Sequence, residues 1–212
     1  MSESPKSSRS STAIFNHARA TRSDIAKHHP AGEVGHFVHF YEDDRFALEN
    51  ILRLASKRMG AGDSGIFVAT QAHLGTIEQG LTASGLHLNA LRTGGRHVTH
   101  DADVVLSRFM EDGWPNQERF FGSIGDIVGE ALERNSNRSI LIFGEMVARL
   151  CAQDNAAAAI QLERLWNLLS ERYRFALWCA YPLRIFENDA GAETMHKICA
   201  EHSLVVPAES PL

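Results

Sequence analysis

The sequence predicts a three-layer α/β fold in which a mostly parallel sheet of five or more strands is covered by helices on both faces. Short apolar segments alternate along the chain with longer segments whose apolar residues recur every three or four positions. Residues 139–143 are apolar on both alternating faces, as expected of a central strand in a parallel sheet. Parallel neighbours also need crossover helices, and the strand–helix alternation supplies them.

The first strand–helix unit begins with residues 36–41, an apolar run rich in β-formers. Asp43 or Asp44 caps the helix that follows, whose apolar positions continue to Met59. A cluster of glycines and an aspartate at residues 60–63 ends this helix. The unit therefore predicts the first strand of the sheet and its first crossover helix.

Later segments repeat this alternation. We expect a strand at residues 66–70 and a helix at residues 72–84. A further strand is expected at residues 96–100 and a short helix at residues 103–112. Residues 86–92 fit neither pattern clearly. Trp114 and Pro115 open a further helix with one broad apolar face.

The C-terminal elements follow the predicted central strand. They comprise a helical stretch interrupted at Asp154 and Asn155, a strand over residues 175–180 that stops at Pro182, and a last helix near residues 192–201.

Composition indicates a single folded domain with tails. With 212 residues, 44% of them hydrophobic, the chain can bury one sizeable core. We expect one α/β domain over residues 34–204 and a frayed tail at residues 205–212. Residues 1–33 are rich in Ser, contain several basic residues and have few large apolar ones, which predicts a disordered basic arm. This arm is either a solubilising tail or a docking peptide.

Charge and cysteine content limit the classes of function. The formal net charge of -5 provides no positive field to attract nucleic acid or an anionic membrane. Cys151, Cys179 and Cys199 cannot all pair with one another and show no CxxC spacing, which fits a reducing compartment. Apolar runs stay far below the roughly 20 residues that cross a bilayer. We expect a cytoplasmic protein that binds neither nucleic acid nor membrane directly.

Polar side chains follow the predicted strands, at the edge where ligands collect in open α/β sheets. The candidate ligand-binding residues of this crevice are Tyr41, Glu42, Gln71, Glu145, Met146, Tyr181 and Arg184, with Asp101 at the same edge. Their mixture of polar groups among apolar neighbours suits a small organic ligand. The chain contains no GK[ST] sequence, and acidic residues 42–44 follow the first strand, so ATP and GTP are not expected to bind.

Glu145 is the most informative residue, because it directly follows the predicted central strand. Burying this carboxylate without a partner would be costly, so it either binds a ligand or pairs with an arginine such as Arg149 or Arg184. Tyr41 and Tyr181 also follow strands of the same sheet. We therefore expect both phenols and Glu145 to line one shared pocket.

The histidines and cysteines give no catalytic or metal-binding signature. The 11 histidines lack the spacing of a ligand set, so no metal, no other cofactor and no catalytic residue is predicted. His36 differs, because a histidine in an apolar strand needs a hydrogen-bond partner or a ligand. It is a further ligand-binding candidate, with a satisfied core histidine as the alternative. His39 should point to the opposite face of the sheet, and Cys179 is expected in the core.

Four motifs in order resemble the MEDS domain, a sensory domain of methanogen and methylotroph signalling proteins of the DcmR type. They are HFVHFYE at residues 36–42, FGEMV at 143–147, LERLWN at 162–167 and CAYP at 179–182, within a resemblance that covers residues 35–186. The resemblance implies a RecA-like or KaiC-like core that has lost its P-loop, and a sensory role toward hydrocarbon-type small molecules. It also implies an output module, such as a DNA-binding, histidine-kinase or anti-sigma-factor-like module.

Three functions remain open from the sequence. The leading hypothesis is a stand-alone sensory module that binds a small organic ligand and modulates a signalling partner such as a kinase or an anti-sigma-type regulator. No output module fits before residue 35 or after residue 186, so output is expected through a separate protein or through self-association as a homo-oligomer. The alternatives are a protein-interaction module without a ligand, and an enzyme with Glu145 as general base and Tyr41 or Tyr181 as donor.

Overall fold

The computed structural model describes residues 34–135, 139–187 and 190–206. By its contacts the chain divides into two units, Met1–Pro30 and Ala31–Leu212, and the described residues all belong to the second. The expected basic arm and residues 207–212 of the expected tail lie outside the described residues.

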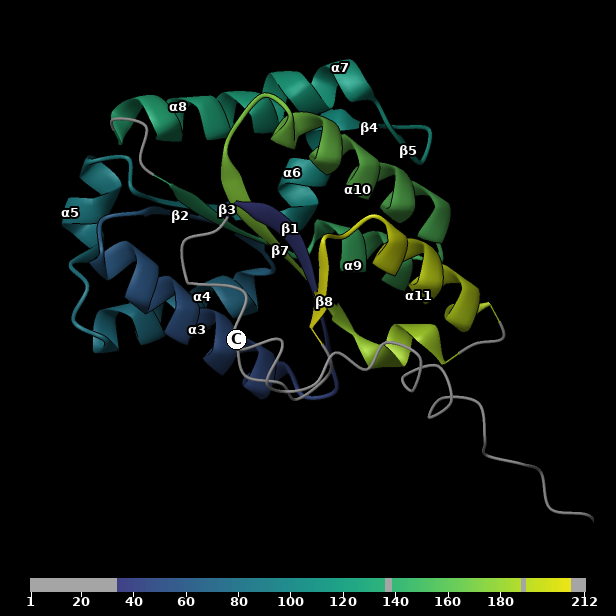
Figure 1. Cartoon of the computed structure of the whole chain (residues 1–212), viewed down its shortest axis with the longest axis horizontal. Helices are drawn as coiled ribbons and strands as arrows, with labels where there is room; N and C mark the ends of the chain where they lie inside the picture. The colour runs from purple at the N-terminus through teal and green to yellow at the C-terminus, as the bar shows by residue number, and fades with distance from the viewer. Residues whose placement is uncertain (1–33, 136–138, 188–189, 207–212) are drawn as a thin grey trace, which may run out of the picture. The chain divides into compact units, whose positions relative to one another are not determined.

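The core of the second unit is one parallel sheet, as the sequence predicts (Figure 1). It has six strands in the order β3-β2-β6-β7-β1-β8. Their bounds are β1 Gly35–Tyr41, β2 Ser64–Ala69, β3 His97–Asp101, β6 Ile140–Gly144, β7 Phe175–Pro182 and β8 Leu204–Val206. The strand predicted at residues 139–143 is β6, and it lies with β7 at the centre of the sheet. The three-layer α/β prediction is confirmed.

Three helices cover one face of the sheet: α3 (Asp44–Gly60), α4 (Gln71–Ala83) and α5 (Leu88–Thr93). Asp43 caps α3, since its side chain accepts a hydrogen bond from the Arg45 amide. The ambiguous segment after α4 forms α5. Side chains such as Ile51, Ile77 and Phe143 are fully or nearly fully buried in the core between these helices and the sheet.

The other face is covered by a longer series of helices. They are α6 (Ala102–Phe109), α7 (Gln117–Phe120), the π-helix η2 (Phe121–Gly125), α8 (Asp126–Arg134), α9 (Met146–Ala152), α10 (Ala156–Ser170) and α11 (Gly191–Ala200). A 3₁₀-helix, η3 (Leu183–Phe186), follows β7. This layer encloses the larger hydrophobic core, centred on aromatic residues such as Phe120, Trp166 and Phe175.

Three short strands were not predicted. The short antiparallel strands β4 (Met110–Glu111) and β5 (Trp114–Pro115) are joined by a turn in which Asp112 and Gly113 have positive φ angles of 49° and 77°. Asn116, rather than Trp114, then caps the next helix. Strand β8 pairs with β1 and extends to Val206, so the sheet reaches into the tail expected from residue 205.

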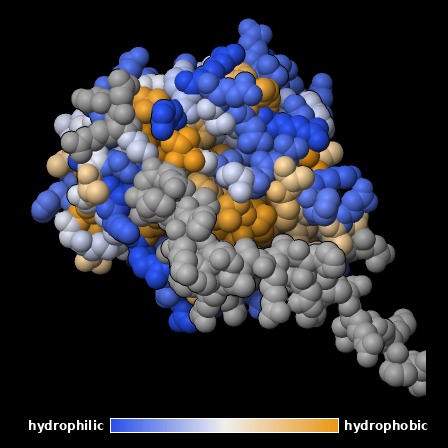
Figure 2. All heavy atoms as spheres, in the orientation of Figure 1, coloured by the Kyte–Doolittle hydropathy of each residue, from blue (hydrophilic) through white to orange (hydrophobic). Residues whose placement is uncertain are grey.

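The outside of the second unit is largely polar on the face that Figure 2 draws. Hydrophilic side chains predominate along the upper edge, where α7, α8 and α10 lie, with small apolar areas between them. Among the described residues, no helix is long and apolar enough to span a bilayer.

Candidate functional site

The connections of the sheet determine where a crevice can form. The helix after β2 lies on one face and the helix after β6 lies on the other, although β2 and β6 are neighbours. The same reversal occurs between β1 and β7. In open α/β sheets, such switch points leave a crevice at the carboxyl ends of the two strands. Glu145 follows β6 at the first switch point, and Tyr41 ends β1 at the second.

Glu145 joins the ends of β2 and β6. Its Oε2 accepts a hydrogen bond of 3.0 Å from the Thr70 amide, and its Oε1 lies 2.5 Å from His73 Nδ1. Thr70 in turn caps α4 through its hydroxyl group, which accepts from the His73 amide. The carboxylate is therefore held at the first turn of α4, where a negative charge is stabilised by the helix dipole.

Two further charged residues surround this pair. Arg184 Nη1 lies 3.6 Å from Asp44 Oδ1, and both charges act on Tyr41 and His73. Burial and the negative charges of Glu145 and Asp44 raise the pKa of Tyr41, so its phenol is neutral. The hydrogen bond with Glu145 raises the pKa of His73 above its ordinary value despite partial burial. Tyr41, Asp44, His73, Glu145 and Arg184 are called the strand-end cluster below.

Arginine pairing, one of the two alternatives for Glu145, is not found among the described residues. Arg149 instead binds Asp103 through Nε and Nη2, at 3.0 and 2.8 Å, and Arg184 lies beside Asp44. Glu145 takes its partners from the first turn of α4, because β2 is its neighbour in the sheet and Thr70 is the first residue after β2. The strand order sets this pairing, which is why the sequence alone did not show it.

The other predicted crevice residues are dispersed. Glu42 and Gln71 are exposed near the strand-end cluster, at the start of α3 and α4. Met146 is buried in the core on the opposite face of the sheet. Whether these residues bind a ligand remains a prediction.

Tyr181 does not share a pocket with Tyr41 and Glu145, and that expectation is wrong. Tyr181 is paired with Phe40 across the sheet, while Tyr41 is paired with Pro182. Successive strand residues point to opposite faces, so the two phenols lie in different cores. The Tyr181 hydroxyl donates a 2.6 Å hydrogen bond to Glu163 Oε1 in the core beneath α10.

His36 belongs with Tyr181 to a second polar cluster, which lies in the core. His36 Nε2 lies 3.1 Å from Glu163 Oε2 and 3.4 Å from Cys179 Sγ. Burial alone would raise the pKa of Glu163, but the charges of His202 and His36 and the hydrogen bonds from His36 and Tyr181 outweigh it and lower this pKa to about 2. Burial raises the pKa of the Cys179 thiol well above its ordinary value. His36, Glu163, Cys179 and His202 are called the buried cluster below, and they could hold a metal ion.

The sequence showed only part of the buried cluster. His36 was identified as a histidine in need of a partner and Cys179 as a core residue, and His39 lies on the opposite face as expected, beside Tyr41 and Phe46. Glu163 and His202 were missed. Glu163 is a charged residue at a helix position facing the core, and that departure from the apolar pattern was the available signal.

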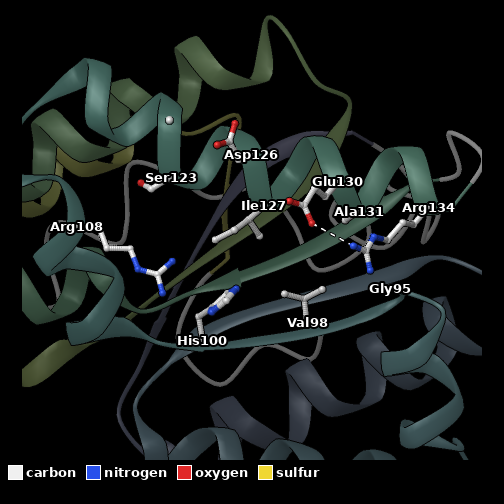
Figure 3. Close-up of a pocket in the computed structure, with 11 residues that line it drawn as sticks. Gly95, Val98, His100, Arg108, Ser123, Asp126, Ile127, Glu130, Ala131 and Arg134 are labelled. Carbon is white, nitrogen blue, oxygen red and sulfur yellow. Dashed lines mark hydrogen bonds and ion pairs between the residues drawn. The ribbon is translucent and has the colours of Figure 1, made fainter.

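A cavity of about 500 Å³ lies between β3 and the helices α6, η2 and α8 (Figure 3). Its apolar lining is formed by Val98, Ile127 and Ala131. The charged and titratable side chains around it are His100, Arg108, Asp126, Glu130 and Arg134. Figure 3 shows Val98 and Ile127 pointing toward one another from β3 and α8, with the Arg108 guanidinium on the side of His100.

The charged side chains at the cavity differ in whether they have an ion-pair partner. Glu130 and Arg134 form an ion pair one helical turn apart. Arg108 makes no ion pair or hydrogen bond with any part of the chain that the structure describes, and burial together with the Arg108 charge lowers the pKa of His100. An unpaired guanidinium next to apolar side chains can bind the acidic group of an organic molecule.

Comparison with known proteins gives one result. A family model described as the methanogen/methylotroph, DcmR sensory domain matches residues 35–202. No curated protein matches the chain significantly.

Proposed function

The chain belongs to the MEDS family of sensory domains, and on this premise we propose that it binds a small organic molecule and signals its presence to a partner protein. The single observation that supports a ligand most strongly is the cavity between β3 and α8. Its volume of about 500 Å³ falls within the range of sites for small organic molecules.

The chemistry of the cavity indicates a ligand with an acidic group and an apolar body. Arg108 would bind a carboxylate or a similar anion, because a guanidinium offers a planar set of donors. Val98, Ile127 and Ala131 would contact the apolar part. Such a site differs from a nucleotide-binding site, which would need a loop of backbone amides to bind a triphosphate.

The π-helix η2 gives a route by which a ligand could change the conformation. Gly122 and Ser123 of η2 line the cavity, and η2 connects α7 to α8. A π-turn within a helix is uncommon, and such turns occur often at functional sites. A ligand that contacts η2 more favourably in one arrangement of α7 and α8 would shift the population toward that arrangement. The altered helices would then present a different surface to a kinase or an anti-sigma-type regulator.

The strand-end cluster is a second candidate position for the ligand. The observation that favours it is the convergence of Tyr41, His73, Glu145 and Arg184 at the switch points of the sheet. Its Glu145 carboxylate already accepts hydrogen bonds from the chain, so a ligand there would have to add to that pair or compete with it.

Nuclear magnetic resonance titration separates the two positions. The uniformly ¹⁵N-labelled full chain would be titrated with a panel of linear carboxylic acids and the corresponding alcohols. We expect a carboxylic acid to shift the amides of Val98, Ser123 and Ile127, and to lose affinity in Arg108→Met. Arg45→Met is the matched control, because Arg45 is an exposed arginine of α3 and lies outside the cavity.

The outcomes discriminate among the candidate functions. Shifts centred on His73 and Glu145 that disappear in His73→Asn would place the ligand in the strand-end cluster instead. Binding unaffected by both Arg108→Met and His73→Asn would reject both positions. A chain that binds no member of the panel but still binds a signalling partner would favour the interaction module without a ligand.

A further inference from the structure

The buried cluster brings together four potential metal ligands from four distant parts of the chain. His36 lies on β1, Glu163 on α10, Cys179 on β7, and His202 follows α11. One ligand atom from each residue lies within 4.8 Å of every other. None of these side chains is more than slightly exposed, and those of Glu163 and His202 are completely buried.

The tautomer of His36 is determined by Asn167. The Asn167 amide nitrogen donates to the Glu201 carbonyl oxygen at 2.9 Å, which leaves Asn167 Oδ1 as the acceptor for His36 Nδ1 at 2.8 Å. His36 Nδ1 therefore donates to Asn167, and Nε2 faces Glu163 and Cys179. Metal-binding histidines are oriented in the same way, through a hydrogen bond from the nitrogen that does not bind the metal.

His202 is held by a similar arrangement. Its Nδ1 donates a 2.7 Å hydrogen bond to the Ile198 carbonyl oxygen. Its Nε2 lies 3.5 Å from Glu163 Oε1 but makes no hydrogen bond with any of the described residues, although the side chain is completely buried. A buried nitrogen without a hydrogen bond is costly, which is an independent indication that another group is bound there.

The buried Glu163 carboxylate requires a positive charge beside it. The Nε2 atoms of His36 and His202 both face the carboxylate oxygens of Glu163, which is fully buried. Tyr181 and Cys179 each donate one hydrogen bond to this carboxylate, but neither compensates its charge. A proton or a metal ion in the cluster would do so.

We propose that His36, Glu163, Cys179 and His202 form a buried binding site for a single transition-metal ion of the zinc class. Zinc prefers four ligands drawn from imidazole nitrogen, thiolate sulfur and carboxylate oxygen. With metal–ligand distances of about 2.0–2.3 Å, the ligand atoms of a tetrahedral site lie about 3.3–3.8 Å apart. Several pairs of the buried cluster already lie 3.1–3.5 Å apart, so binding needs only a small contraction of the widest pairs.

The ion would tie the end of α11 to the sheet. His202 is attached to the sheet through neighbouring Ser203, whose amide and hydroxyl group both donate to the His36 carbonyl oxygen. Binding would convert the Cys179 thiol to a thiolate and release its proton, so the affinity should increase with pH. This inference is independent of a ligand in the cavity, because the two sites share no residue.

Cobalt(II) is a suitable probe because a thiolate ligand gives an intense absorption band that imidazole and carboxylate ligands do not. The full chain would be treated with a chelator under reducing conditions and then titrated with Co²⁺. We expect one equivalent to produce the thiolate band and a tetrahedral visible spectrum, and Zn²⁺ to remove both. Zn²⁺ should also raise the melting temperature of the chelator-treated chain.

Matched variants assign the ligands. Cys179→Ala should abolish the thiolate band, whereas Cys151→Ala and Cys199→Ala should retain it. His202→Asn should weaken binding, while His196→Asn should not, because His196 is an exposed residue of α11 outside the buried cluster. Asn167→Ala should weaken binding by about 10–100-fold, because it removes the group that orients His36.

The proposal is overturned if wild-type protein gives no thiolate band at one equivalent of Co²⁺. It is equally overturned if Cys179→Ala, shown to be folded by circular dichroism, keeps both the band and the stabilisation by Zn²⁺. If Cys179→Ala does not fold, His202→Asn is used as the test instead. An unchanged Co²⁺ affinity in His202→Asn would contradict the proposed site.

Discussion

Two buried carboxylates on opposite faces of the sheet differ in how their charge is compensated. Glu145 accepts from the Thr70 amide and pairs with His73 at the first turn of α4. Glu163 faces two histidines, a thiol and a phenol in the interior of the core. A helix terminus and one histidine satisfy the first, whereas the second needs a positive charge from the facing imidazoles or from a bound ion.

We predict that Glu145→Gln lowers both the stability of the protein and the pKa of His73. The variant replaces hydrogen bonds to a charged group, which contribute about 1.5–3 kcal/mol each, by weaker ones. The pKa of His73 is raised by Glu145, so this interaction stabilises the fold below the unfolded pKa and is lost as the pH rises through the folded pKa. The loss of unfolding free energy in Glu145→Gln should therefore be larger at pH 6 than at pH 9.

Urea unfolding at both pH values and an NMR titration of the His73 ring measure these effects. Glu49→Gln is the control, since Glu49 is an exposed residue of α3. An unchanged His73 pKa in Glu145→Gln would contradict the role assigned to Glu145.

We predict that the protein loses stability in acid because His39 is buried in its neutral form. Burial lowers its pKa from 6.5 to about 4, and its Nε2 has no hydrogen-bond partner among the described residues. Because the unfolded chain takes up a proton more readily, stability decreases as the pH falls from above 6.5 to below 4. At about 1.4 kcal/mol per pKa unit, the contribution is on the order of 3 kcal/mol.

The test is urea unfolding of wild type and His39→Leu between pH 4 and 8. Relative to wild type, His39→Leu should become more stable as the pH falls, while the exposed-residue variant His196→Asn should follow wild type. A constant difference between wild type and His39→Leu across this range would show that His39 does not cause the acid sensitivity.

At the residue scale, the sequence predicted which side chains follow strands but not their partners. Tyr41, Glu145 and Arg184 were identified and do lie together, whereas His73 was missed because its role depends on β2 being next to β6. Tyr181 was expected after the strand, but β7 extends two residues beyond the predicted end at residue 180, so Tyr181 lies within the strand and faces the side opposite to Tyr41.

At the element scale, the junction between η3 and α11 is closely packed. A Cβ atom on Gly191 would lie 1.9 Å from the Phe186 carbonyl oxygen, whereas one on Gly75, within α4, would meet nothing within 4 Å. We predict that Gly191→Ala destabilises the protein by about 1–3 kcal/mol. Gly75→Ala should stabilise it by about 0.5–1 kcal/mol, because alanine is the better helix former.

Thermal and urea unfolding of the two variants measure this difference. The substitution of glycine by alanine should thus lower the free energy of unfolding at position 191 and raise it at position 75. Equal effects of the two variants would indicate that α11 is not fixed against η3.

The turn between β1 and α3 should exclude nucleotides. Asp43 already caps the N-terminus of α3, Asp44 lies beside Arg184, and Glu42 is exposed at the same turn. A phosphate there would meet three carboxylates and no lysine of a phosphate-binding loop. Calorimetry should detect no micromolar binding of ATP or GTP, and micromolar affinity for either nucleotide would refute this prediction.

Most elements were predictable because their apolar patterns are long. The alternation predicted β1, β2, β3, β6 and β7 within about two residues, which is the usual uncertainty of element ends. Strand β8 has three residues, and the hairpin strands β4 and β5 have two each, so none offers a period to recognise. Their pairing depends on tertiary contacts with β1 and with one another.

At the scale of the whole folded unit, the two faces of the sheet contain different sites. The face beneath α3 and α4 contains the strand-end cluster, and its polar groups are largely paired with one another. The face beneath α6 to α11 contains both the cavity beside β3 and the buried cluster beneath α10. A sensory domain needs one region that binds and another that changes, and the second face contains a cavity lined in part by the π-helix η2.

Native mass spectrometry of the full chain, purified without added ligands, tests the central claim of a small-molecule sensor most directly. Accurate mass distinguishes an organic adduct from a bound metal ion and gives the number of subunits in the same spectrum. We predict an organic adduct on wild type that is retained in Arg45→Met and lost or reduced in Arg108→Met. A wild-type chain without an organic adduct, or an adduct equally abundant in Arg108→Met, would contradict the cavity beside β3 as the sensory site.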